Sequence, residues 1–441
     1  MSYLDNIFFA ITLIIGFGIF ATNVKKIYRN IRLGQPIDRS DNKSQRWKQM
    51  LMIAFGQTKM VRRPIAGILH LVVYIGFVII NLELLEIIID GLFGTHRVFS
   101  GFLGSFYNVL IASFEILALL VVVVVVVFWL RRNAIKLNRF VSSDLKNWPK
   151  NDANYILYFE IVLMTLFITM NAADAWLQNV DHAGYVKAGA FPVSQYLMPL
   201  FGGMQASTVL MIERATWWMH ILGILLFLNY LYFSKHLHIL LAFPNTYFGD
   251  LNPQGQFNNL ESVTNEVKLM LDPTVDPFTA APASDAPSRF GAKDVMDLNQ
   301  VQLLNAYTCT ECGRCTSVCP ANQTGKKLSP RKIMMATRDR LEEVGKVLDK
   351  NKNQWVEDGK SLLNDFITPE ELWACTSCNA CVEECPVSIS PLSIIMDMRR
   401  YLVMEESAAP MSLNAMMTNI ENNGAPWQYN QMDRLNWKDE N

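Results

Sequence analysis

Long apolar stretches dominate the first half of the chain. Five of them run at about 4–24, 64–89, 109–130, 155–177 and 208–233, with polar loops between. A hydrocarbon core of about 30 Å needs roughly 20 helical residues, and each stretch reaches that length. A buried helix of a soluble protein is the alternative for any single stretch, but five in succession favour a membrane bundle. The pattern therefore predicts five transmembrane helices.

Positive charge in the loops predicts the orientation of this bundle. The loops after the first and third stretches are rich in Lys and Arg, whereas the loops at about 90–107 and 178–207 carry very few. The positive-inside rule then places the N-terminus outside and the C-terminus in the cytoplasm of a cell bounded by an inner (cytoplasmic) membrane. Because MSYLDN contains no basic residue, we expect the first stretch to be a retained anchor, not a cleaved signal peptide.

Composition narrows the class of protein. The 441 residues are 51% hydrophobic and 18% charged, and the formal net charge is −1. A chain this neutral lacks the basic excess of a nucleic-acid-binding protein. The composition also excludes a disordered chain and a disulfide-stapled secreted module. All eight cysteines lie after position 308, so the apolar part and the cysteine part have different roles.

Two cysteine motifs carry the strongest chemical signal. Both have the spacing C-x2-C-x2-C-x3-C-P, which wraps a cubane [4Fe–4S] cluster: three close thiolates bind one cluster and the fourth binds the other. A tetrahedral zinc site is the alternative, but it uses two C-x2-C pairs and leaves one cysteine of each triplet without a purpose. We therefore assign Cys309, Cys312, Cys315 and Cys385 to one cluster, and Cys375, Cys378, Cys381 and Cys319 to the other.

The segments around these motifs predict the domain organisation. The stretch 272–291 is rich in Pro, Ala, Ser and Asp and is typical of a linker, while RKIMMATRDRLEEVGKVLDK is amphipathic and predicts a helix. We predict an all-α chain with a membrane domain at 1–243, a linker at 244–296, a helical dicluster ferredoxin domain at 297–405 and a C-terminal tail at 406–441.

Histidines within the apolar stretches are scarce and therefore informative. His70 lies in the second stretch and His220 in the fifth. A histidine satisfied by an interhelical hydrogen bond is the alternative, but two on antiparallel spans favour haem iron held between facing helices. Because no C-x2-C-H occurs, such a haem is bound non-covalently. We expect His96 and His182, in the outer loops, to be solvated.

His238 is the candidate ligand for a second haem. It follows His220 by eighteen residues. On one continuous helix the two would share a face, roughly 27 Å apart. Its partner stays open, because the second stretch contains no second histidine. Met60 stands ten residues before His70 and methionine can ligate haem, but Pro64 between them is expected to begin the helix.

Glu213 is the candidate for acid–base chemistry. It lies next to Arg214 near the outer end of the fifth stretch, about two turns from His220. A quinol oxidised there needs a proton acceptor, which this carboxylate would supply. An interfacial charge pair is the alternative for it and for the other polar groups at membrane depth: Glu83, Glu86, Glu115, Glu160, Asn171 and Asp174.

Three blocks of sequence resemble a known family. WWMHILGILLFLNYLYFSKHLHILLAFPN resembles the last span of membrane iron–sulfur oxidoreductases whose membrane part is like the diheme gamma subunit of respiratory nitrate reductase. AYTCTECGRCTSVCPANQTGKKLSP and ACTSCNACVEECPVSISPLSIIMDMRR resemble their ferredoxin modules, which are related to heterodisulfide reductase. The likeness covers nearly all of residues 1–405. It implies a quinone-reactive cytochrome b that passes electrons through two clusters.

Carried over by position, the resemblance implies roles for individual residues. His70 and His220 match the ligands of an outer haem b, and His238 matches one ligand of an inner haem. Met60 stands where the nitrate reductase subunit has its fourth histidine, which departs from the family pattern. Many relatives continue into CCG domains that perform the terminal chemistry. We expect this chain to lack them and to need a soluble cytoplasmic subunit of the CCG-domain or flavoprotein type.

The sequence thus predicts an oxidoreductase subunit that relays electrons between a membrane quinone, haem b, two [4Fe–4S] clusters and a soluble partner. The alternative is a membrane-tethered iron–sulfur redox sensor without haem or quinone chemistry, in which His70 and His220 are packing residues. A transporter is a third interpretation, but the sequence contains neither an inverted repeat nor paired broken helices.

Overall fold

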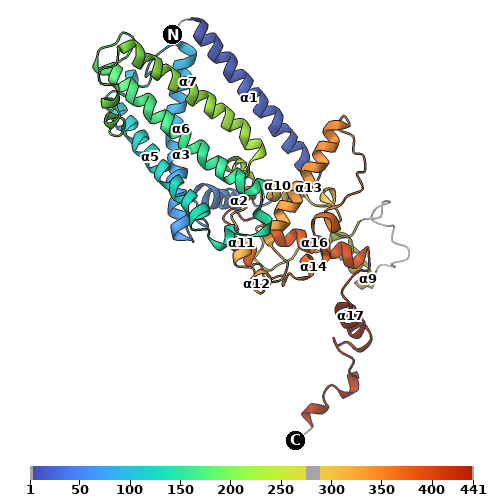
Figure 1. Cartoon of the computed structure of the whole chain (residues 1–441). Helices are drawn as coiled ribbons and strands as arrows, with labels where there is room; N and C mark the ends of the chain where they lie inside the picture. Colours follow the sequence, from blue (N-terminus) through green and yellow to red (C-terminus); the bar gives the residue numbers. More distant parts are fainter. Residues whose placement is uncertain (1–2, 275–288, 440–441) are drawn as a thin grey trace.

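Five long helices form a bundle in the first half of the chain (Figure 1). The computed structural model describes residues 3–274 and 289–439. Each of the five is long and apolar enough to cross a membrane, which confirms the five predicted spans. They extend beyond the apolar runs at several ends. Their bounds are α1 (Tyr3–Ile31), α3 (Pro64–Phe93), α5 (Ser105–Trp129), α6 (Trp148–Asn179) and α7 (Ala206–Tyr230).

The bundle has a dry interior and an apolar outer surface. Phe114, Phe167 and Ile221 are fully buried between helices, whereas Ile14 and Leu226 point outward and are 72% and 61% exposed. Outward-facing side chains of this kind suit lipid and not water. Helices α6 and α7 pack closely, because Gly223 has no side chain to displace Leu163. The bundle is therefore built to stand in a hydrocarbon layer.

The fifth span breaks shortly after Tyr230. A 3-10 turn at Leu231–Phe233, an extended Ser234 (φ −113, ψ 145) and a second turn at Lys235–Leu237 lead into α8 (His238–Tyr247). The Ser234 hydroxyl accepts a hydrogen bond from the backbone N–H of His236 (3.0 Å), which caps the new turn. The prediction that His220 and His238 share one face of a continuous helix is therefore wrong.

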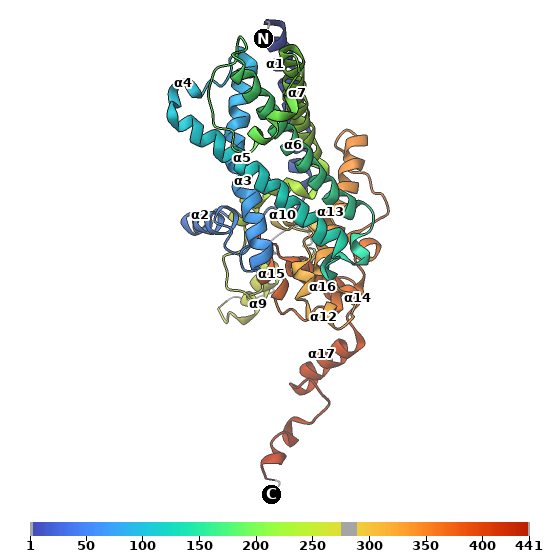
Figure 2. The same ribbon diagram turned by 60° about the vertical axis from the view of Figure 1, so that its left-hand side comes forward.

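Short helices around one long helix make up the cysteine-bearing domain at the end of the bundle opposite the N-terminus (Figures 1 and 2). The long helix, α13, coincides with the predicted amphipathic segment and lies between the two cysteine motifs. Its bounds and those of its neighbours are α10 (Gln300–Thr308), α11 (Arg314–Ser317), α12 (Pro320–Gln323), α13 (Pro330–Lys350), α14 (Pro369–Trp373), α15 (Ala380–Glu384) and α16 (Pro391–Met404).

Four further helices lie outside these two layers. The segment predicted as a linker contains the end of α8 and the whole of α9, and its residues 275–288 lie outside the described part of the chain. Helix α17 and the turns after it extend away from the rest of the molecule (Figures 1 and 2). The bounds are α2 (Lys43–Met50), α4 (Ser100–Leu103), α9 (Glu261–Leu271) and α17 (Met411–Asn423).

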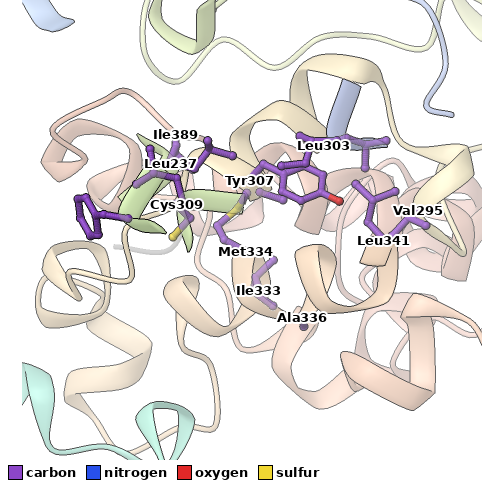
Figure 3. Packing of buried hydrophobic residues seen from close by; sticks show 14 of the residues in the cluster. Leu237, Val295, Leu303, Tyr307, Cys309, Ile333, Met334, Ala336, Leu341 and Ile389 are labelled. Atoms are coloured by element: carbon purple, nitrogen blue, oxygen red, sulfur yellow. The ribbon is translucent and has the colours of Figure 1, made fainter. Parts of the chain in front are cut away.

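The bundle and the cysteine-bearing domain share one hydrophobic core. Leu237, from the turn before α8, packs near Cys309 and Ile389 (Figure 3). On the other side, Asn30 of α1 donates a hydrogen bond to the Tyr307 hydroxyl (2.9 Å). These contacts come from residues far apart in the sequence, so the cysteine loops are held at a defined place against the bundle.

Candidate metal centres

The two cysteine loops repeat the same unusual backbone. Glu311 and Gly313 in the first loop have φ values of 56° and 73°, and Ser377 and Asn379 at the matching positions have 58° and 60°. Left-handed residues turn the chain sharply, so successive cysteines can point to one centre. In both loops a short helix follows, α11 in the first and α15 in the second. The sequence repeat is thus also a repeat of local structure.

Four cysteines of the predicted first cluster line one pocket. Cys385, which comes from the second motif, lies in this pocket with the first triplet. The full set of cysteines around it is Cys309, Cys312, Cys315, Cys381 and Cys385. Cys319 has Cys375 and Cys381 as electrostatic neighbours, so the fourth cysteine of each motif stands beside the triplet of the other.

The spacing of these side chains does not suit a single metal ion. Within residues 3–274 and 289–439, no group of three or more His, Cys, Asp or Glu side chains is arranged to hold one. Thiolates around a cubane cluster stand farther apart than the ligands of one ion, because each binds a different iron. The arrangement is therefore compatible with clusters and speaks against the zinc alternative.

The thiols need a cation to ionise. Burial raises the pKa of Cys309 and Cys381 to about 12 and that of Cys385 to about 11, because desolvation disfavours the thiolate. Bound iron would supply the missing positive charge. Cys378 differs from these three because it is exposed to solvent. The second loop therefore has a solvent-facing corner, whereas the first faces the bundle.

Charged side chains fasten the first loop to the bundle. Arg314, between Cys312 and Cys315, donates hydrogen bonds to the carbonyl oxygen (3.0 Å) and the sulfur (3.2 Å) of Met60. Lys235 forms an ion pair with Glu311, which Arg338 also contacts (2.7 Å). Met60 lies before α3, which begins at Pro64 as expected, and its sulfur contacts a guanidinium instead of facing a histidine.

Three histidines gather beside this loop. The ring centre of His70 lies 6.5 Å from that of His238, and His236 lies 5.4 Å from His238. Burial lowers the pKa of His236 to about 3 and also lowers that of His238, so both rings are neutral. His220 has the ring of Phe167 as its aromatic neighbour, at 5.8 Å. The structure thus places His70 beside His238.

The opposite end of the bundle contains a buried polar network that sequence analysis missed. Arg97, a lone basic residue in an outer loop, is only 7% exposed. Its guanidinium contacts Asp174 (2.6 Å) and Glu83 (3.2 Å). His96 is half-buried and lies 3.1 Å from Asp174, so it is not the solvated loop residue that we expected. Four carboxylates without basic partners in their own helices were the available signal: Glu83, Glu86, Glu115 and Asp174.

Glu213 belongs to the same end of the bundle. Its buried carboxylate forms an ion pair with Arg214 and accepts a hydrogen bond from the Tyr185 hydroxyl (2.7 Å). The ring of Tyr185 lies 4.8 Å from that of His96, which in turn contacts Asp174. Glu213 is therefore the inner member of a polar chain that reaches a half-exposed histidine.

Fold and cysteine loops together define an all-α iron–sulfur protein with a bundle of candidate membrane spans. Residues 308–389, which include all eight cysteines, match the family described as a 4Fe-4S dicluster domain. No solved structure matches the chain.

Three curated relatives extend this comparison. The chain is 30% identical over 451 residues to the "Probable iron-sulfur-binding oxidoreductase FadF" of Bacillus subtilis, covering 96% of this chain and 59% of that protein. It is 29% identical over 432 residues to the "EtfAB:quinone oxidoreductase" of Syntrophomonas wolfei, covering 92% of this chain and 55% of the relative. Its cysteine-bearing part is 28% identical over 113 residues to a protein of Archaeoglobus profundus whose name likens it to a heterodisulfide reductase subunit (26% and 49%). The chain thus spans less than two thirds of each.

Proposed function

We propose that this protein is a membrane-bound electron-transfer subunit that relays electrons between a quinone in an inner (cytoplasmic) membrane and a soluble cytoplasmic partner. Two [4Fe–4S] clusters and haem b are its electron carriers. The names of two relatives, an iron-sulfur-binding oxidoreductase and an EtfAB:quinone oxidoreductase, support this chemistry. The soluble partner is of the EtfAB, flavoprotein or CCG-domain type, and the similarity to heterodisulfide reductase subunits supports such a complex.

One observation carries the proposal: the pocket of the first cluster adjoins the end of the bundle that holds buried histidines. Asn245 of α8 donates to the carbonyl oxygen of Val387 (2.8 Å), just after Cys385, and Lys235 reaches Glu311. The first-cluster ligands are Cys309, Cys312, Cys315 and Cys385, and those of the second are Cys375, Cys378, Cys381 and Cys319. Crossed neighbours in the two pockets support this assignment.

The histidines fit a haem. The Nδ1 atoms of His70 and His220 are buried and have no hydrogen-bond partner in the described part of the chain. A buried ring nitrogen without a partner is costly, which weakens the interpretation that these are packing residues. The resemblance offers His70, His220, His238 and Met60 as ligands, and contact with Arg314 disfavours Met60. Haem iron supplies one-electron chemistry when bound there.

At the outer end, Glu213 is the proposed proton acceptor of the quinone site. Tyr185 holds its carboxylate and links it to His96, which gives a proton a route to solvent. The positive-inside rule supports the corresponding orientation, N-terminus outside and clusters in the cytoplasm.

The test uses the whole chain purified into lipid nanodiscs. We expect about eight irons in clusters per chain, b-type absorption bands, and reduction of both by a quinol analogue. Glu213→Gln should slow this reduction at least tenfold, while the exposed control Asp181→Asn should not. Clusters without any b-type band would instead establish the membrane-tethered redox sensor.

A further inference from the structure

His70 and His238 face each other across the cluster-facing end of the bundle. His70 lies within α3, and His238 is the first residue of α8, directly after the break at Ser234. Their ring centres are 6.5 Å apart, with an angle of 47° between the rings. Without the break, His238 would continue α7 away from this position. The interruption of the fifth span is therefore what brings the two imidazoles together.

Their separation leaves room for one atom between the rings. A direct N–H···N hydrogen bond spans about 3 Å and adds roughly 1 Å at each ring, so it brings the ring centres to about 5 Å. Two imidazoles on opposite sides of one metal, each bound at about 2.0 Å, have ring centres roughly 6 Å apart. The observed 6.5 Å is close to the second value.

The number of protein ligands identifies the kind of metal. A lone zinc ion takes three or four protein ligands, but no group of three His, Cys, Asp or Glu side chains able to hold an ion occurs among the described residues. His236 does not complete such a set, since its ring packs on Phe227 at 5.3 Å. Haem iron needs only two protein ligands, because the porphyrin supplies the other four.

The surroundings prepare His238 for this role. Its Nδ1 lies 3.1 Å from the backbone carbonyl oxygen of Lys235 and donates to it, so the proton is on Nδ1 and Nε2 keeps its lone pair. A histidine that binds metal usually has its other ring nitrogen fixed in this way. The ring of His70 carries the unpartnered Nδ1 described above and is likewise buried.

We propose that His70 and His238 are the two axial ligands of one haem b beside the first cluster, and that His220 is not a ligand of it. This rests on the proposed function only in requiring that a haem is bound. It differs from the pairing of His70 with His220 that the family resemblance implies.

The pairing also couples the haem site to the first cluster loop. Lys235 offers its carbonyl oxygen to His238 and its ammonium group to Glu311, between Cys309 and Cys312. On the other side, Arg314 holds the segment that leads into α3. Both ligand segments are thus fastened to the loop that binds the first cluster.

The experiment compares histidine variants of the full-length chain, purified from membranes, by haem content and low-temperature electron paramagnetic resonance. His70→Ala and His238→Ala should each lower the haem per chain at least tenfold. His220→Ala should keep it, as should the matched control His236→Ala, whose ring is equally buried 5.4 Å from His238. Cluster iron in every variant reports folding.

A second pair of variants guards against loss of structure. His70→Met and His238→Met should retain haem, because methionine can ligate it, but with an altered low-spin signal and a raised potential. Haem lost in His220→Ala and kept in His238→Ala would overturn the pairing while leaving the proposed function intact. A wild-type chain without haem would overturn both.

Discussion

The ammonium group of Lys235 forms an ion pair with the carboxylate of Glu311. Lys235 follows the break in the fifth span, and Glu311 stands between two cysteines of the first loop. Both side chains are almost completely buried. A buried ion pair gives position more than stability, because desolvation offsets much of its attraction. The pair therefore sets where the first cluster loop stands relative to the bundle.

The crossed arrangement of the cysteines predicts which substitutions share a phenotype. Cys385→Ser should remove the same cluster signal as Cys315→Ser, because both side chains line one pocket. Cys319→Ser should instead resemble Cys375→Ser. Iron content and electron paramagnetic resonance of the reduced protein check this. If Cys385→Ser resembled Cys375→Ser, each motif would bind its own cluster and the crossed assignment would be wrong.

Gly313 tests the backbone of the first loop. Its φ is +73°, and an added Cβ would lie 2.6 Å from Nη1 of Arg331 and 3.0 Å from the carbonyl oxygen of Arg139. That Nη1 is itself held by the Arg139 carbonyl (2.7 Å) and cannot easily move. We expect Gly313→Ala to lower the iron bound per chain.

Gly325 provides the matched control. Its φ is +81°, and nothing lies within 4 Å of an added Cβ. Gly325→Ala should therefore cost only the left-handed strain, about 1 kcal/mol, and should keep both clusters. Equal iron loss in the two variants would show that crowding around Gly313 is unimportant.

Arg97 should be essential for the outer end of the bundle. Arg97→Gln leaves the buried carboxylates of Asp174 and Glu83 without their cation, which should cost about 3–5 kcal/mol. Thermal unfolding in detergent measures this as a large fall in Tm. Lys187→Gln removes an exposed pair with Asp181 and should change stability by less than about 0.5 kcal/mol. A similar small effect for both would contradict the role of Arg97.

Asp144 predicts a specific dependence on pH. Burial alone would raise the pKa of this carboxyl, but hydrogen bonds from Arg331, Ser142 and Ser329 outweigh it and lower the pKa below the usual 3.8. Arg331 binds both carboxylate oxygens, at 2.8 and 3.0 Å. A lowered folded-state pKa means that the stabilisation is fully present above about pH 3.8 and is lost only as the pH falls through the lower value.

Asp144→Asn should therefore destabilise the protein by about 3 kcal/mol, since it leaves the buried Arg331 without its counterion. The difference in Tm between wild type and variant should stay constant from pH 8 to pH 5. A difference that shrinks within this window would mean that Asp144 titrates there, and would contradict the lowered pKa.

Local patterns were enough to predict much of the architecture, because they report on short-range physics. Run lengths of apolar residues predicted five spans, and cysteine spacing predicted the dicluster domain. The break at Ser234 was missed because apolar residues flank it on both sides and a single serine is compatible with a helix. The burial of Arg97 was missed because a lone basic residue in a loop is usually solvated. Which histidine faces His70 depends on tertiary packing, which spacing along one helix cannot report.

The exposed thiol of Cys378 has a consequence of its own. A corner that an electron-accepting protein can approach is equally open to dioxygen and peroxide, whereas the loop against the bundle is shielded. Air should therefore bleach the outer cubane first, so anaerobic handling decides how much of the relay survives isolation.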